Sequence, residues 1–287
     1  MSTRSTLPNA GRNLPAAIGS GVALGVIVIA SLFTYKWLFG VVAIFALLIA
    51  VREFVRALSR RNISVSRTPV YAATMIIPAV AYIWGFEAQL VATGISILVV
   101  MFWRIRKGAA GFLVDISASV LLIAYLPFMA AFLMLSLAAD NGAWRVVVFI
   151  LLTISNDIGG YAFGVFFGKH PMAPTLSPKK SWEGFAGSLL LQSVVGVVAF
   201  VYVFDAPWWQ GLVAGLVLTV TATGGDFVES AIKRDLRVKD MGSIVPGHGG
   251  MMDRLDSLIP NAFASWVVFT IFLGTGIASS VAFMAVS

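Results

Sequence analysis

Nine apolar runs divide the sequence, and eight of them contain no charged residue. A helix needs about 20 apolar residues to cross the hydrocarbon core of a bilayer, and fewer when it packs inside a bundle. Only 11% of the residues are charged, whereas a soluble domain carries about 25%. The pattern predicts an all-α, polytopic integral membrane protein with about nine transmembrane helices, at Leu14–Thr34, Trp37–Val51, Pro69–Trp84, Ala88–Trp103, Ile116–Ala139, Val146–Phe167, Phe185–Phe204, Trp208–Thr223 and Leu258–Met284.

The first apolar run follows a polar stretch that carries Arg4 and Arg12. It lacks a small-residue cleavage site before a soluble domain, so we expect a retained first helix rather than a removed signal peptide. The sequence contains no cysteine. This absence excludes disulfides, a thiolate nucleophile and cysteine-ligated metals.

The basic residues lie mainly on one side of the predicted helices. With the N-terminus in the cytoplasm, 18 of the 20 Lys and Arg residues are cytoplasmic and only Lys36 and Arg145 are outside. Positive charge in short loops marks the cytoplasmic side of a membrane protein. We therefore predict an N-in, C-out topology in a bacterial-type inner membrane, and this placement of the net charge of +7 argues against nucleic-acid binding.

Five arginines cluster between the second and third runs, at Arg52, Arg56, Arg60, Arg61 and Arg67. Basic residues beside a membrane attract anionic headgroups. Two interpretations follow, one in which they determine topology and one in which they also recruit an anionic lipid substrate.

Acidic residues concentrate in the C-terminal half of the chain. Eight of the 13 lie on the predicted cytoplasmic side between Asp157 and Asp256. We expect the first four helices within residues 1–110 and a catalytic region within residues 111–287, with a polar cavity that opens to the cytoplasm.

The most informative segment is Gly224–Ser257. If a helix begins after the break at Gly224 and Gly225, five polar residues share one face of it: Asp226, Glu229, Ser230, Lys233 and Arg234. A glycine-rich turn at residues 246–250 would let backbone N–H groups approach an anion, and a second helix then carries Asp253 and Asp256. Such an arrangement suits Mg²⁺ and substrate phosphates. The competing interpretation is a solvated loop with ion pairs.

A second segment, Asn156–Gly187, carries Asp157 inside an apolar run, where an ionisable group is functional by default. Glycines at 160, 164 and 168 indicate a ridge of small residues for close helix packing. The loop that follows supplies two cations, two hydroxyls and a carboxylate, and Ser181 could also cap the next helix. These residues are Ser177, Lys179, Lys180, Ser181 and Glu183.

The residues from Ser230 to Asp256 resemble the signature of the phosphatidate cytidylyltransferases, also called CDP-diacylglycerol synthases. The match spans 27 residues and comprises Ser230, Ile232, Lys233, Arg234, Lys239, Asp240, Gly242, Pro246, His248, Gly249, Gly250, Asp253, Arg254, Leu255 and Asp256. Val245 stands where the family has Leu, Ile or Phe.

Upstream residues are also similar to this family. They are Asp157, Tyr161, Phe163, Gly164, Phe167, Gly168, Lys169 and the run Ser177–Gly184. Ser181 replaces the commoner Thr and Gly160 the usual Ala. The first four predicted helices carry no motif that supports the resemblance.

The resemblance implies an Mg²⁺-dependent enzyme that transfers CMP from CTP to phosphatidate, giving CDP-diacylglycerol and pyrophosphate. It implies that Asp226 and Asp253 hold the metal centre. We assign to catalysis Lys233, Arg234, Lys239, Asp240, His248, Arg254 and Asp256. We assign to nucleotide binding and the cavity Asp157, Ser177, Lys179, Lys180, Ser181, Glu183, Glu229 and Ser230.

Two other functions compete with this expectation. A CTP-dependent lipid kinase of the polyprenol type would share the setting but release CDP and a lipid phosphate. A transporter would place charges or broken helices near the middle of the membrane in paired halves, which this sequence does not show. The partners that we expect are the two substrates and membrane lipid, and the apolar helices of the N-terminal half would also suit a homodimer.

Overall fold

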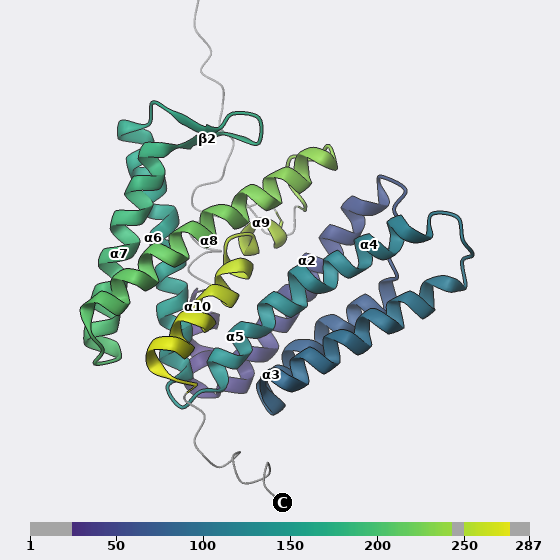
Figure 1. Cartoon of the computed structure of the whole chain (residues 1–287), viewed down its shortest axis with the longest axis horizontal. Helices are drawn as coiled ribbons and strands as arrows, with labels where there is room; N and C mark the ends of the chain where they lie inside the picture. The colour runs from purple at the N-terminus through teal and green to yellow at the C-terminus, as the bar shows by residue number, and fades with distance from the viewer. Residues whose placement is uncertain (1–24, 243–249, 276–287) are drawn as a thin grey trace, which may run out of the picture.

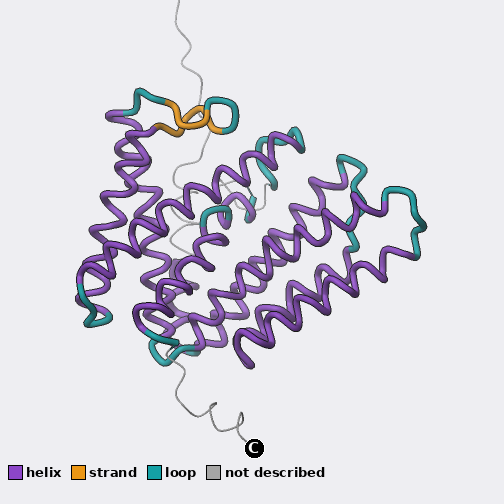
Figure 2. The backbone as a smooth tube through the Cα atoms, in the orientation of Figure 1, coloured by secondary structure: helices purple, strands orange, loops and turns teal. Residues whose placement is uncertain are grey.

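The computed structural model describes residues 25–242 and 250–275, and this part of the chain is almost entirely helical (Figures 1 and 2). It contains seven helices long and apolar enough to cross a membrane, and a shorter apolar helix at Gly25–Thr34. The predicted all-α membrane fold is confirmed. The helices are α2 (Lys36–Ser59), α3 (Arg67–Ile105), α4 (Phe112–Ile123), the π-helical turn η1 (Ala124–Phe128), α5 (Met129–Ala138), α6 (Gly142–Phe167), α7 (Trp182–Val203), α8 (Trp208–Asp235), α9 (Met252–Leu255) and α10 (Leu258–Leu273).

The long element α3 is a hairpin of two helical arms. Its backbone leaves the helical conformation at Gly85, where φ is 84° and ψ is −166°, a conformation that favours glycine. Pro69 and Val99, at opposite ends of the element, line the same crevice. The arms correspond to the third and fourth predicted spans, Pro69–Trp84 and Ala88–Trp103, and the bend at Gly85 lies between them (Figure 1).

Two helices are longer than their apolar runs. Helix α2 continues to Ser59, so that Glu53 and Arg56 lie on the helix rather than in the loop that follows. Helix α8 continues without a break across Gly224 and Gly225 to Asp235. The expected helix break at these glycines is therefore wrong, and the polar face after them extends a transmembrane helix.

The reason for glycine at position 225 is close packing. A Cβ atom built there would lie 2.6 Å from the backbone oxygen of Asp256 and 2.6 Å from Cγ of Pro260. Helix α8 thus meets the junction between α9 and α10 at backbone distance. This contact brings the polar end of α8 next to the residues that precede the last helix.

Helices α6 and α7 also pack at backbone distance. A Cβ atom at Gly159 would lie 2.6 Å from the backbone oxygen of Gly187, and one at Gly184 would lie 2.9 Å from that of Gly160. The predicted small-residue ridge is confirmed at Gly160 and Gly164, which face Gly184. Helix α7 packs in turn on α8, and α10 lies between α8 and α5 (Figure 1).

A small β-hairpin interrupts the helical fold between α6 and α7. Strand β1 (Pro171–Ala173) pairs antiparallel with β2 (Ser177–Ser181), which contains the two lysines expected in a loop (Figure 2). The side chain of Ser181 accepts a hydrogen bond from the Gly184 backbone N–H at 3.1 Å, so the predicted helix cap is confirmed. The cap joins the hairpin rigidly to α7.

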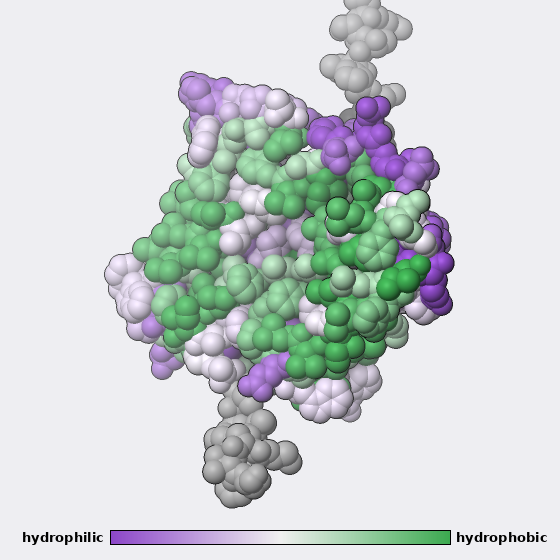
Figure 3. All heavy atoms as spheres, turned by 45° about the vertical axis from the view of Figure 1, so that its right-hand side comes forward, coloured by the Kyte–Doolittle hydropathy of each residue, from purple (hydrophilic) through white to green (hydrophobic). Residues whose placement is uncertain are grey.

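The face of the bundle shown in Figure 3 is largely apolar. Large hydrophobic side chains are exposed on several helices, among them Trp84 at 69%, Phe166 at 79% and Tyr202 at 83%. Soluble monomers rarely expose apolar patches of such extent, and a membrane protein presents them to lipid. Hydrophilic residues gather mainly at the margins of the face shown in Figure 3.

Gly224 and Gly225 offer a matched pair of substitutions that tests the contact between α8 and α10. An added Cβ at Gly224 meets nothing within 4 Å, whereas one at Gly225 overlaps the next helix. Alanine favours a helix over glycine by about 1 kcal/mol, and overpacking costs about 1–3 kcal/mol. We expect Gly224→Ala to raise the melting temperature in detergent and Gly225→Ala to lower it, measured by tryptophan fluorescence on heating. Equal shifts would contradict the close approach.

Candidate functional site

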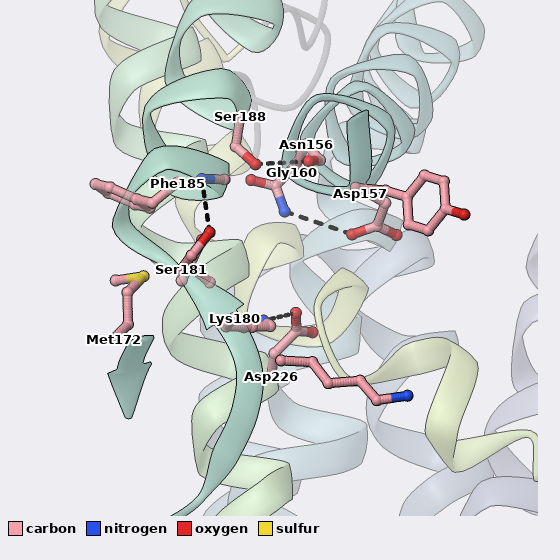
Figure 4. Close-up of a pocket in the computed structure, with 13 residues that line it drawn as sticks. Asn156, Asp157, Gly160, Met172, Lys180, Ser181, Phe185, Ser188 and Asp226 are labelled. Atoms are coloured by element: carbon pink, nitrogen blue, oxygen red, sulfur yellow. Dashed lines mark hydrogen bonds and ion pairs between the residues drawn. The ribbon is translucent and has the colours of Figure 1, made fainter. Parts of the chain in front are cut away.

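A polar cavity of about 200 Å³ lies between α6, α7, α8 and the β-hairpin (Figure 4). Five of the residues selected from the sequence line it, although they come from segments far apart in the chain: Asp157, Lys179, Lys180, Ser181 and Asp226. The two segments singled out by the sequence therefore meet in one place.

An ion pair between Lys180 and Asp226 crosses the cavity (Figure 4). Lys180 belongs to β2 and Asp226 to the polar end of α8, 46 residues later. The lysine ammonium also lies 5.0 Å from the centre of the Phe227 ring, a distance at which a cation and a π-system attract each other. The pair keeps a carboxylate and an ammonium side by side in a partly buried setting.

The wall of the cavity on α6 is formed by Asn156 and Asp157. The Asn156 side-chain amide donates to Asp157 at 3.4 Å, and the Asn156 backbone oxygen accepts from the Ser188 hydroxyl on α7 at 2.7 Å. Asp157 also lies close enough to Asp226 to interact with it electrostatically. Two carboxylates on neighbouring helices thus face the same space.

Sequence reasoning did not select several residues of this wall: Asn156, Met172, Phe185, Ser188 and Thr223. Three of them carry a signal that could have been used. Asn156, Ser188 and Thr223 are polar residues within or next to apolar runs. Each lies within one helical turn of a selected residue or of Gly184, the last residue of the motif run Ser177–Gly184.

A second cluster lies one to two turns further along α8. Lys233 forms ion pairs with Glu229 on its own helix and with Asp253, the latter at 2.9 Å. Glu229 is fully buried. A buried carboxylate without a cation is strongly unfavourable, so Lys233 is needed to hold both acids in place.

Asp253 is also held by backbone donors. It accepts hydrogen bonds from the Met241 N–H at 3.1 Å and from the Gly250 N–H at 3.0 Å. Met241 lies before residues 243–249 and Gly250 lies directly after them, so Asp253 is hydrogen-bonded to the chain on both sides of this segment. The carboxylate therefore organises the backbone around it as well as pairing with Lys233.

Asp256 lies near both the Lys180–Asp226 pair and the cluster of Glu229, Lys233 and Asp253. It lies close enough to both Asp226 and Glu229 for electrostatic interaction, and its Oδ1 accepts from the Ser257 N–H at 2.7 Å. Asp226, Glu229 and Lys233 occupy one face of the continuous α8, at the spacing predicted for a helix. The face expected after a helix break thus exists without the break.

Other predicted residues lie around the two clusters without lining the cavity. Arg234 is exposed and donates to the Leu176 backbone oxygen at 3.4 Å. Ser177 begins β2, and Ser230 is half-buried on α8. Lys239 and Asp240 are exposed. Their assigned roles stay predictions, and His248 lies outside the described residues.

Glu183 has a local partner instead of a place in the cavity wall. Its carboxylate accepts from the backbone N–H groups of Lys169 and His170 at 3.1 and 3.2 Å, and it pairs with the His170 ring at 2.5 Å. These contacts fasten the start of the β-hairpin to the first turn of α7. A role in nucleotide binding stays a prediction for this residue.

A third feature is an apolar cavity of about 250 Å³ beside the charged clusters. It lies between α2, α5, α6 and the α9–α10 region, and its walls include Phe39, Leu47, Leu133 and Phe149. Arg254 is the one charged residue among the described residues that line it. A cavity with one cation and apolar walls suits a molecule that is charged at one end and hydrocarbon at the other.

Comparison with known proteins identifies the family to which this chain belongs. The sequence profile of the cytidylyltransferase family matches residues 15–272, which is most of the chain. The chain belongs to the cytidylyltransferase family. Its relatives include the phosphatidate cytidylyltransferase of Mycobacterium leprae, 37% identical over 286 residues that cover 94% of this chain and 91% of the relative.

Two further relatives match to different extents. The phosphatidate cytidylyltransferase of Mycobacterium bovis is 37% identical over 275 residues, covering 91% of this chain and 90% of the relative. That of Staphylococcus saprophyticus is 33% identical over 187 residues, covering 64% of this chain and 71% of the relative. The resemblance noted from the motifs is therefore confirmed at the level of the family.

Lys233 provides a test of the charge balance in the second cluster. Lys233→Met leaves Glu229 buried without its cation, and removing one partner of a buried pair costs about 3–5 kcal/mol. We expect a lower melting temperature in detergent for the single variant. The double variant Lys233→Met with Glu229→Gln should regain much of that loss, since the uncompensated charge is gone. A single variant as stable as the unmodified protein would refute the buried ion pair.

Proposed function

We propose that this protein is a phosphatidate cytidylyltransferase, which transfers CMP from CTP to phosphatidate and releases CDP-diacylglycerol and pyrophosphate. The observation that carries the proposal is the Lys180–Asp226 pair, through which the two signature segments meet in one polar cavity. Membership of the cytidylyltransferase family and the breadth of the likeness to the Mycobacterium leprae enzyme support it.

The reaction is an in-line displacement at phosphorus. A phosphate oxygen of phosphatidate attacks the α-phosphorus of CTP, a new P–O–P bond forms, and the bond to pyrophosphate breaks. A dianionic phosphate is already a nucleophile, so no general base is needed. Catalysis then rests on positioning the two anions and on stabilising their charge.

The basic residues of the site would position the two anions and stabilise their charge. Lys180 is held at the polar cavity by Asp226, and Lys233 is held further along α8 by Glu229 and Asp253. Both would contact the phosphates of CTP. Arg254 would contact the phosphate of the lipid, because it lies at the apolar cavity. Arg234 and Lys239 lie at the exposed edge of the same region and would attract the incoming nucleotide.

The apolar cavity would receive an acyl chain of phosphatidate. Its walls come from helices of both halves of the chain and carry almost no polar surface. Burial of one methylene group stabilises binding by about 0.8 kcal/mol. The phosphate of the lipid would then lie at Arg254, beside the carboxylates of α8 and α9.

The carboxylates of the site fit Mg²⁺, which prefers oxygen ligands and usually shares them with phosphates and water. Asp226 and Asp253 would hold the ion, and when bound it would neutralise phosphate charge. Within residues 25–242 and 250–275 no three acidic or histidine groups converge to enclose a metal by themselves. This donor set suits an ion that completes its coordination with substrate.

The direction of the site in the membrane follows from the basic residues. Because 18 of the 20 Lys and Arg residues lie on one side of the predicted helices, we place the active site on the cytoplasmic face of a bacterial inner membrane. The N-terminus lies on the same face in this arrangement. CTP is a cytoplasmic metabolite, and the placement gives it direct access.

A product assay tests the reaction. Purified protein in detergent, given phosphatidate, CTP and Mg²⁺, should form CDP-diacylglycerol and pyrophosphate in equal amounts, and EDTA should stop both. Pyrophosphate is measured by a coupled assay and the lipid by mass spectrometry. Release of CDP with a newly phosphorylated lipid alcohol would instead identify a lipid kinase.

Asp226→Asn and Asp253→Asn test the carboxylates that we assign to the metal. Each keeps the shape of the side chain and removes its charge, so we expect kcat to fall by about 10²–10³, as for loss of other preorganised electrostatic groups. The melting temperature should fall only modestly for Asp226→Asn, because the side chains of Asp226 and Lys180 are both partly exposed to solvent. Turnover equal to that of the unmodified protein in either variant would contradict the assignment of that carboxylate to the metal.

A further inference from the structure

Glu53 is a buried carboxylate of the N-terminal half that reaches the signature segment. It lies on α2 and is only 1% exposed. Its Oε2 accepts a hydrogen bond from the Met252 backbone N–H at 2.9 Å, across 199 positions of sequence. Among the described residues it forms no ion pair, and its Oε1 has no hydrogen-bond partner there. A buried acid of this kind is costly unless the surrounding structure uses it.

The carboxylate lies against the two glycines that flank residues 243–249. A Cβ atom at Gly242 would overlap Oε1 of Glu53, and one at Gly250 would lie 2.6 Å from Oε2. The same position at Gly250 is 2.7 Å from the Gly242 nitrogen. Gly242 and Gly250, on either side of residues 243–249, therefore both pack against the Glu53 carboxylate. A side chain at either position would collide with this carboxylate.

Glu53 and Asp253 both accept hydrogen bonds from the backbone that flanks residues 243–249. Glu53 accepts from Met252, while Asp253 accepts from Met241 and Gly250. The Gly250 Cβ position also lies 2.9 Å from Asp253 Oδ2, so both carboxylates lie against this glycine. Removing Glu53 would leave the segment tied at Asp253 alone.

Helix α9, which carries Asp253 and Arg254, depends on such an anchor. It has 4 residues, and a single helical turn is unstable without tertiary contacts. Helix α2 packs against it, and the hydrogen bond from Met252 to Glu53 is made at its first residue. The position of α9 relative to α8 is thus set partly from the N-terminal half.

We propose that Glu53 is a positioning residue, which holds the first turn of α9 so that Asp253 and Arg254 face the polar end of α8. The proposal rests on the proposed function for its consequence in catalysis. Its structural part, the placement of α9, can be measured without turnover.

The activity arm compares three replacements of Glu53. Glu53→Ala and Glu53→Asp lose the contact with Met252, and groups that orient a metal-binding residue are typically worth about 10–100-fold in activity or metal affinity. We expect kcat to fall by about that factor and the Mg²⁺ concentration for half-maximal activity to rise, with the KM for CTP changing less. Glu53→Gln keeps the length and an acceptor oxygen, so it should retain most of the activity.

Asp115 supplies a matched control outside the site. It is another buried carboxylate that fastens a loop, accepting from the Ser64 backbone N–H at 2.7 Å while pairing with Arg104 at 2.8 Å. Asp115→Asn should lower the melting temperature and leave the Mg²⁺ dependence unchanged. If Glu53→Ala behaves in the same way, with stability lost and the Mg²⁺ dependence intact, the positioning role is wrong.

A second arm is independent of the reaction. The chain has no cysteine, so Met252→Cys introduces a single thiol at a position that is 0% exposed. Its rate of maleimide labelling should rise about tenfold or more when Glu53→Ala is added and should not change with Asp115→Asn. Unchanged labelling overturns the proposal. Because labelling needs no substrate, an enzyme inactive on phosphatidate would refute the proposed function without deciding the role of Glu53.

Discussion

Carboxylates inside a bundle of apolar helices need cations or N–H donors, and this requirement organises the C-terminal half of the protein. Asp226 is paired with Lys180, and Lys233 pairs with both Glu229 and Asp253. The Lys180–Asp226 and Lys233–Asp253 pairs join elements that are distant in sequence, whereas the Lys233–Glu229 pair lies within α8. The charged groups that chemistry would use are therefore also the groups that hold the helix ends together.

Such pairing is possible because the helices approach one another at glycine positions. The contacts of Gly159 with Gly187 and of Gly225 with the α9–α10 junction bring backbones together where a larger residue would separate them. Short side chains such as Asp226 can then reach across to a neighbouring element. With wider helix spacing the same residues would face lipid or solvent singly, at a much higher cost.

The spacing of polar residues predicted the face of α8, because helical periodicity is local information. The assignment of the two segments to one site rests on the family resemblance and not on their spacing. Helix ends were less predictable: α8 runs through Gly224 and Gly225, since tertiary packing overrides the low helix propensity of glycine. Glu53 was missed for a different reason. Its partner is 199 residues away, so only the three-dimensional fold reveals what it holds.

The border between polar and apolar surroundings lies at the short helix α9. Arg254 lines the apolar cavity and is still near enough to Asp157 to interact with it electrostatically. A lipid with an anionic headgroup is divided in the same way, into a charged end and hydrocarbon chains. Because α9 has only 4 residues, its position depends on contacts with other elements. The position of this border therefore depends on the same contacts. Glu53 and Asp253 make such contacts, which is why a residue of the N-terminal half bears on chemistry placed in the C-terminal half.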